Sequence, residues 1–255
     1  MADLVQVDSL DGGAFWRVAF GAAKGNILDR ATMRALAAVF REARTARTLK
    51  AVCLEGAGAD FSYGASVREH LPGEVPAMLA DFRSLVLDVL DSGVIVAAAV
   101  RGQCLGGGLE LAGVCHRVFA SADARLGQPE IALGVFAPLA SIVLPARIGR
   151  AHGEDLCLTG RVIPAAEART MGLVDEIAAD PAEAALAWAR AHFAGRSASS
   201  LRLAVRAVRA DLASRIRTEL PALEALYVNE LMTTADAVEG LTAFLDKRRP
   251  AWRDA

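Results

Sequence analysis

Two glutamates near glycine-rich segments give the strongest chemical signal in this sequence. Glu110 lies between two leucines, two positions after the end of the glycine run 106–108. Glu130 lies twenty positions later, between a proline and an isoleucine. A carboxylate in apolar surroundings is costly to ionise, so its pKa tends to rise. Two neighbouring carboxylates can then hold opposite protonation states, one as a base and one as an acid. The alternative is that each is a solvated glutamate at a helix start.

The glycine run 106–108 follows an apolar segment and leads into the helix-compatible sequence Leu-Glu-Leu-Ala. Glycine lets a backbone approach a ligand closely. A helix start adds unpaired N–H groups and the positive end of the helix dipole. Such a segment can hold a phosphate or an oxyanion.

Several other catalytic patterns are missing from the sequence. The glycine run lacks the third glycine of a dinucleotide-binding fingerprint, and there is no P-loop or Gly-x-Ser-x-Gly nucleophile motif. The four histidines never pair at His-x-x-x-His spacing, so we expect no metal site. Each histidine is expected to be solvated or structural.

An alternation of strands and helices must position these residues. Apolar and alternating segments predict an opening hairpin, followed by buried strands that alternate with amphipathic helices. This order predicts an α/β fold with largely parallel strands, with residues 1–195 as the catalytic core and 196–255 as a helical C-terminal region. The predicted hairpin covers 4–20, the strands 50–55, 94–100, 117–121 and 173–177, and the helices 30–47, 78–90, 182–193, 199–212, 215–231 and 236–247.

The composition limits the partners and the compartment. The formal net charge is −2 and no basic patch stands out, so we expect no nucleic-acid partner. The longest apolar run, 94–100, is too short to span a bilayer, and the N-terminus lacks the features of a secretion signal. The four cysteines form no Cys-x-x-Cys pair and lie in apolar stretches, which favours free thiols in a reducing compartment. We expect a cytoplasmic protein without a membrane partner.

The loops around both glutamates resemble those of the crotonase (enoyl-CoA hydratase/isomerase) superfamily. Residues 106–112, Gly-Gly-Gly-Leu-Glu-Leu-Ala, and 127–134, Gly-Gln-Pro-Glu-Ile-Ala-Leu-Gly, are similar to the hydratase pattern in sequence and spacing. Residues 61–65 resemble its first oxyanion loop, 158–175 the stretch after the active site, and 236–250 its C-terminal signature. The resemblance covers essentially the whole chain. It implies a ClpP-like spiral of ββα units with a helical C-terminal region.

The resemblance also implies a mechanism. The carbonyl oxygen of an acyl-CoA thioester is expected between the backbone N–H groups of Ala65 and Gly107, where negative charge collects as water attacks the β-carbon. Glu110 is the better candidate to activate the water, and Glu130 is expected to deliver a proton to the α-carbon. Isomerases of the superfamily commonly keep only one of these carboxylates, so two favour hydration. The CoA belongs to the substrate, and no separate cofactor is expected.

Further residues are expected at the substrate by the same resemblance. Lys24 and Asn26 fit an early CoA-binding segment, while Phe244 and Lys247 match C-terminal residues that contact the CoA of a neighbouring subunit. Family members usually form trimers or dimers of trimers, and we expect the same here. The other expected contacts are Ser62, Gly64, Val67, Gly106, Pro129 and Phe136.

Two segments depart from the fatty-acid hydratases and bear on the acyl group. Residues 22–29 replace the usual early segment, and residues 135–141, Val-Phe-Ala-Pro-Leu-Ala-Ser, replace the glycine-rich stretch that admits a straight chain. With residues 64–72, they resemble the branch of the family that hydrates cyclohexa-1,5-diene-1-carbonyl-CoA during anaerobic benzoyl-CoA degradation. We therefore expect a compact ring substrate. The alternatives are a short-chain enoyl-CoA hydratase of fatty-acid β-oxidation, an acyl-CoA isomerase or hydrolase, and a non-enzymatic RNA-binding relative.

Overall fold

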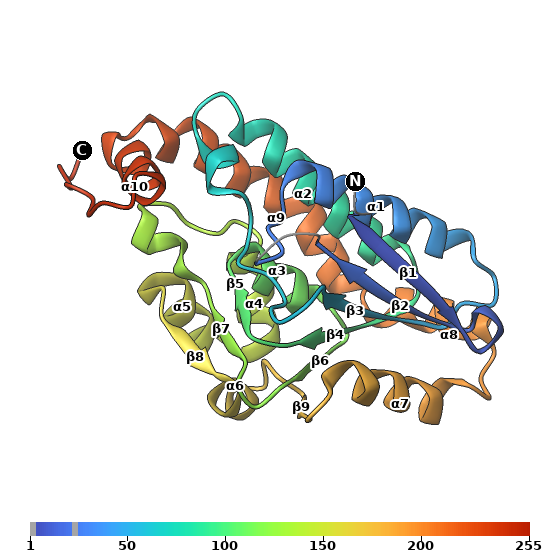
Figure 1. The fold of residues 1–255 in the computed structure, drawn as a ribbon. Helices are drawn as coiled ribbons and strands as arrows, with labels where there is room; N and C mark the ends of the chain where they lie inside the picture. The colour runs from blue at the N-terminus through green and yellow to red at the C-terminus, as the bar shows by residue number, and fades with distance from the viewer. Residues whose placement is uncertain (1–3, 22–24) are drawn as a thin grey trace.

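A six-stranded sheet in the order β1-β2-β3-β4-β6-β9 forms the centre of the protein, in a computed structural model that describes residues 4–21 and 25–255 (Figure 1). β1 and β2 form the expected antiparallel hairpin, and the later pairs in this sheet are parallel. The predicted largely parallel α/β sheet is therefore confirmed. The strands are β1 (Val5–Leu10), β2 (Phe15–Phe20), β3 (Ala51–Gly56), β4 (Ile95–Val100), β6 (Arg117–Ala120) and β9 (Glu176–Ile177).

A second sheet of three short strands lies beside the first and was not predicted. Its order is β5 (Gln103–Leu105), β7 (Arg125–Gly127) and β8 (Val162–Pro164), with β5 and β7 parallel. The chain passes from β4 to β5 to helix α3 (Gly107–Val114), and again from β6 to β7 to the 3-10 helix η3 (Pro129–Leu133). Each unit thus gives one strand to each sheet. Because the carboxyl ends of parallel strands share one edge, α3 and η3 start side by side.

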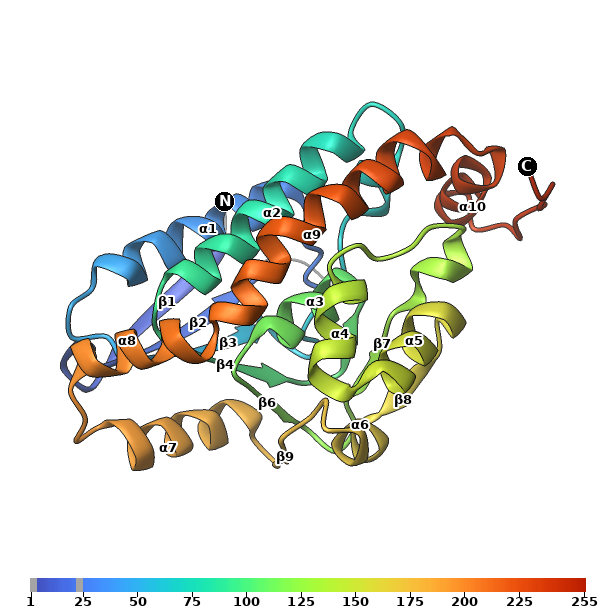
Figure 2. The same ribbon diagram turned by 180° about the vertical axis from the view of Figure 1, so that it is seen from behind.

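Helices cover both faces of the main sheet (Figures 1 and 2). Side chains alternate across a strand. Val52 and Leu54 of β3 therefore join the core beneath α1 (Arg30–Thr45) and α2 (Val75–Asp91), while the alternate residues of the strand face α7 (Pro181–Phe193). Helix α8 (Ala198–Val208) contacts β4 beside α7.

The C-terminal helices pack against the helices that cover the main sheet. Helix α9 (Ala210–Asn229) runs alongside α2 and also contacts α4 (Ala140–Ile148) (Figure 2). Its buried Ile216, Leu220 and Tyr227 belong to the same core as the main sheet. Helix α10 (Ala235–Leu245) contacts η3. The division of the chain near residue 195 stays a prediction.

The largest remaining differences from expectation lie between residues 123 and 177, and several helix ends elsewhere also shift by a few residues. The strand expected over 173–177 is only the two-residue β9, and α4, α5 (Arg150–Thr159) and α6 (Ala165–Met171) were not predicted. Helix α2 begins three residues earlier than expected, with Pro76 in its first turn, where proline is tolerated. Within 4–21 and 25–255, no helix is long and apolar enough to cross a membrane.

Candidate active site

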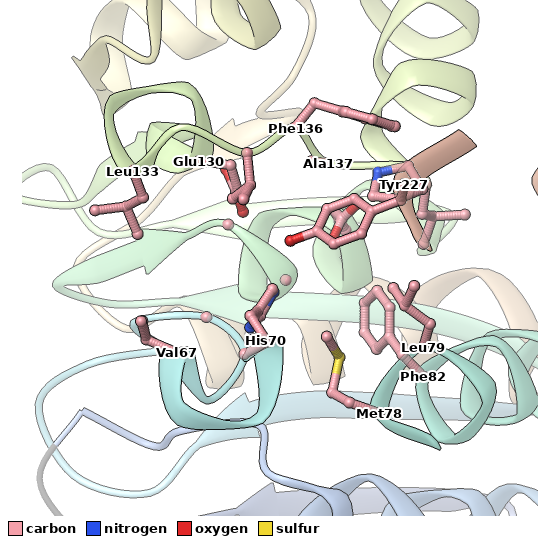
Figure 3. A pocket seen from close by; sticks show the side chains of 18 of the residues that line it. Val67, His70, Met78, Leu79, Phe82, Glu130, Leu133, Phe136, Ala137 and Tyr227 are labelled. Carbon is pink, nitrogen blue, oxygen red and sulfur yellow. The ribbon is translucent and has the colours of Figure 1, made fainter. Parts of the chain in front are cut away.

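A largely apolar pocket lies between the segments that follow β5 and β7 and the helices α2 and α9. It brings together both predicted glutamates and most of the residues expected at a thioester. Figure 3 shows Glu130, His70 and Tyr227 facing the same space, with Met78 and Phe82 on the wall from α2. The predicted site residues that line the pocket are Gly64, Ala65, Val67, Gly106, Gly107, Glu110, Pro129, Glu130 and Phe136.

Glu110 is held in the first turn of α3, with 5% of its surface exposed. Burial raises the pKa of its carboxyl to about 7, and backbone N–H donors from Ala140 and Leu139 oppose that rise. The Ala140 N–H donates to Oε1 at 2.7 Å from the start of α4. A helix N-terminus favours negative charge. These donors therefore fix the carboxylate in place and favour its ionised form.

Glu130 lies in η3, where fewer groups support its charge. Burial and, after it, the negative charge of Glu110 raise the pKa of its carboxyl to about 8. Its Oε2 is buried and has no hydrogen-bond partner among residues 4–21 and 25–255. Its Oε1 accepts a long hydrogen bond from Nε2 of Gln128, at 3.4 Å. Of the two glutamates, Glu130 is therefore the one that favours the protonated form near neutral pH.

The backbone amides of Ala65 and Gly107 meet in one wall of the pocket. A Cβ added at Gly107 would lie 3.2 Å from the backbone N of Ala65. Gly107 is the first residue of α3, so its N–H has no partner inside the helix. Gly64 has φ +101°, and a Cβ there would lie 2.9 Å from the carbonyl oxygen of Leu105. Glycine at 64 thus lets the two loops approach each other closely.

Ser62 and Asn26 are not among the residues that line this pocket, and their contact with substrate stays a prediction. The Ser62 hydroxyl donates to the carbonyl of Asn26 at 2.8 Å and accepts from the N–H of Gly64 at 3.0 Å. The side-chain amide of Asn26 donates to the carbonyls of Ala57 and Asp60. Both residues are buried. They hold the first loop from behind, so their geometry corresponds to loop support.

Phe244 and Lys247 also lie outside the pocket lining. Phe244 lies in the last turn of α10 with 54% of its surface exposed, and the exposed Lys247 follows that helix. Their contact with the CoA of a neighbouring subunit stays a prediction. Lys24 lies outside the described residues.

The sequence analysis did not predict that residues of α2 and α9 line the pocket. Their apolar spacing indicated only that one face of each helix is buried. Met78, Leu79 and Phe82 come from α2. Glu224 and Tyr227 come from α9, and Glu224 forms an ion pair with Arg83 of α2. Apolar spacing does not distinguish a face that packs into the core from one that packs around a substrate.

His70 is another pocket residue that the sequence did not single out. Its Nδ1 lies 2.8 Å from the carbonyl oxygen of Ser66, which assigns the N–H to Nδ1 and leaves Nε2 as an acceptor. Burial lowers the pKa of the imidazole, so His70 is neutral at physiological pH. It therefore adds an uncharged polar group to the pocket that both glutamates line.

Comparison with known proteins identifies the same family that the loop sequences resemble. The family model for enoyl-CoA hydratase/isomerase matches residues 18–255. The chain is 50% identical over 242 residues to a cyclohexa-1,5-dienecarbonyl-CoA hydratase from Thauera aromatica, covering 95% of this chain and 94% of the relative. It is also 36% identical over 235 residues to a probable enoyl-CoA hydratase from Rhizobium meliloti, covering 89% and 90% of the two chains.

Solved structures of the same kind confirm the predicted fold class. An enoyl-CoA hydratase from Mycobacterium avium subsp. paratuberculosis superposes with a TM-score of 0.85 at 26% identity, covering 99% of both chains. A putative enoyl-CoA hydratase from the same organism superposes with a TM-score of 0.88 at 24% identity, covering 98% of this chain and all of the other. From the family match, the 50% identity and the shared fold, this chain belongs to the enoyl-CoA hydratase/isomerase family.

Proposed function

We propose that this protein is a hydratase that adds water to a conjugated acyl-CoA thioester, with cyclohexa-1,5-diene-1-carbonyl-CoA as its substrate. The observation that carries the reaction type is the pair of glutamates with raised pKa values in one pocket. The named substrate is supported by the 50% identity to the Thauera aromatica hydratase.

In this proposal, the thioester carbonyl oxygen accepts hydrogen bonds from the backbone N–H groups of Ala65 and Gly107. Attack of water on the β-carbon drives negative charge onto that oxygen. Fixed donors aimed at developing charge contribute most in such a step, and loss of one costs on the order of 3 kcal/mol. The close approach of the two amides across Gly64 and Gly107 supports this role.

The two glutamates then divide the proton transfers. Ionised Glu110 accepts a proton from the water as its oxygen bonds to carbon, and protonated Glu130 donates a proton to a carbon of the enolate. One water is added in total, and a proton passes from Glu110 back to Glu130 before the next turnover. General acid or base catalysis of this kind contributes typically 10²–10⁴-fold per group. The scheme uses no cofactor beyond the CoA of the substrate.

The shape of the acyl end of the pocket supports a compact ring. Phe136 and Pro138 line the wall in the segment that departs from fatty-acid hydratases. The ring of Phe136 packs against Tyr227 with 5.3 Å between centroids, and Met78 and Phe82 line the wall from α2. Aromatic walls of this kind favour a flat six-membered ring over an extended chain.

The assembly belongs to the same proposal. We infer a homotrimer or a dimer of trimers in which Phe244 and Lys247 of one subunit contact the CoA bound by its neighbour. The exposed position of Phe244 supports this arrangement. Sedimentation analysis tests it, and a monomer at micromolar concentration contradicts it. The cytoplasmic location and the lack of a nucleic-acid partner stay predictions.

The reaction is tested with two substrates. We expect the protein to consume cyclohexa-1,5-diene-1-carbonyl-CoA with loss of conjugated absorbance and gain of one water in the product mass. Its kcat/KM should exceed that for crotonyl-CoA by about tenfold or more, a size that pocket fit can supply. A preference for crotonyl-CoA supports the short-chain hydratase instead. A change in absorbance without gain of water supports an isomerase, and no reaction with either thioester contradicts the proposal.

A further inference from the structure

Tyr227 presents a hydroxyl to the pocket from the side of α9. Its side chain is 1% exposed, and the hydroxyl has no hydrogen-bond partner among the described residues. Figure 3 shows the hydroxyl directed into the cavity, on the side of Glu130 and His70. Buried polar groups in native proteins are nearly always paired, and one left unpaired costs stability. The position of this hydroxyl therefore points to a functional partner.

The charge state of Tyr227 restricts what that partner is. Burial raises the pKa of the phenol, and the negative charges of Glu130 and Glu110 raise it further. The hydroxyl therefore keeps its proton at every pH at which the enzyme works. It acts as a neutral hydrogen-bond donor within electrostatic reach of both carboxylates, so its partner is an acceptor atom close to the glutamates.

A second unpaired atom lies on the same pocket. Oε2 of Glu130 is also buried and lacks a hydrogen-bond partner in the described part of the chain. The two groups do not bond to each other, so one small oxygen-containing molecule between them can satisfy both.

The water of the hydration reaction has the right set of contacts. A water molecule has two hydrogens and two lone pairs. Glu110 accepts one hydrogen as the base, and Glu130 accepts a hydrogen bond from the other through its unprotonated oxygen. One lone pair attacks the substrate carbon, which leaves the other lone pair for a donor. We propose that the Tyr227 hydroxyl donates a hydrogen bond to this oxygen, first in the attacking water and then in the alcohol of the product. This inference rests on the proposed hydratase function.

The surroundings of Tyr227 hold its hydroxyl in place. Its ring packs against Phe136 with 5.3 Å between centroids and against His70 at 6.3 Å. A tyrosine side chain fixed at its ring has little freedom to move its oxygen. Tyr227 thus binds the oxygen from the side of α9, while Glu110 and Glu130 bind it from α3 and η3. It adds no proton-transfer step, because its own proton stays on the phenol.

The test is the Tyr227→Phe variant, which keeps the ring and removes the hydroxyl. We expect kcat for the cyclic dienoyl thioester to fall about 10- to 100-fold, the usual effect of losing a buried hydrogen bond. KM should change less than about twofold, because the hydroxyl contacts the added oxygen and not the CoA thioester. The melting temperature should stay equal or rise, because an unpaired buried hydroxyl has been removed. The pH profile should keep its shape, because Tyr227 does not titrate in that range.

Thr218→Val is the matched control, since it removes a hydroxyl from the exposed side of the same helix. It should leave kcat, KM and the pH profile unchanged. If the wild type hydrates the thioester and Tyr227→Phe keeps the wild-type kcat, the inference is overturned and the proposed function stands. If the wild type hydrates neither thioester, the proposed function fails and this inference fails with it.

Discussion

Oε1 of Glu130 occupies the space that a side chain at Gly106 would need. Gly106 also has φ +52°, in a region that other residues rarely adopt. It is the residue between β5 and α3, so the turn that starts the Glu110 helix also leaves room for the second carboxylate. One glycine therefore couples the placement of both glutamates.

Gly106→Ala should reduce kcat/KM by about 10²-fold or more, because the added methyl displaces the Glu130 carboxyl, and displacements near 1 Å at a reacting centre have effects of this size. Steady-state kinetics on folded protein measure it. Gly58→Ala is the control, because Gly58 also has positive φ but an added Cβ meets nothing within 4 Å. Equal activity in the two variants would show that the contact with Glu130 does not matter.

The pH dependence of kcat/KM should be bell-shaped, with a maximum between about pH 7 and 8. Activity needs ionised Glu110 and protonated Glu130, whose pKa values are raised to about 7 and about 8. The acid limb follows protonation of the base and the alkaline limb follows loss of the proton from the acid. These limbs report apparent values that belong to the pair. A flat profile from pH 5 to 9 would contradict the assignment.

The raised pKa of Glu130 also predicts how stability changes with pH. The folded state holds this proton more tightly than the unfolded state, whose pKa is near 4.5. The resulting stabilisation is fully present below that value and is lost as pH rises through about 8. Glu130→Gln, which stays neutral, should lose less stability over this range in urea unfolding. The exposed control Glu154→Gln should follow the wild type. Parallel curves for all three proteins would argue against a buried acid at 130.

Phe136 should determine acyl specificity, because it lines the pocket in the segment that departs from fatty-acid hydratases. Phe136→Ala opens that wall, so kcat/KM for crotonyl-CoA relative to the cyclic thioester should rise about tenfold. Phe193→Ala makes the same chemical change at the end of α7, on the opposite side of the main sheet, and should leave the ratio unchanged. An unchanged ratio in Phe136→Ala would place the selectivity elsewhere.

The longer elements of the fold were predictable because their hydrophobic patterns are strong. Strand β4 is apolar along its whole length, and α1 shows clear helical spacing. The second sheet was not predictable, because β5, β7 and β8 have three residues each and show no periodicity. β5 and β7 pair because they follow β4 and β6, which are parallel neighbours in the main sheet, and the chain leaves both strands in the same direction. That relationship exists only once the main sheet has assembled.

The site was predictable where chemistry and local sequence coincide, as at Glu110 and Glu130. It was not predictable where a distant helix supplies the group. Tyr227 lies about a hundred residues from the glutamates and reaches them only because α9 docks against α2 and α4. Nothing in the spacing of α9 distinguishes its hydroxyl from the other groups on a buried face. The signal for Tyr227 is its unpaired hydroxyl, which only the folded structure reveals.

The most direct test of the account is the hydration rate of Glu110→Gln, Glu130→Gln and the double variant, with circular dichroism to show that each is folded. Each single variant should lose about 10²–10⁴-fold in kcat. The double variant should be little worse than the weaker single variant, because groups that act as a unit are not additive. Near-wild-type turnover in a folded single variant would contradict a shared role for these two carboxylates.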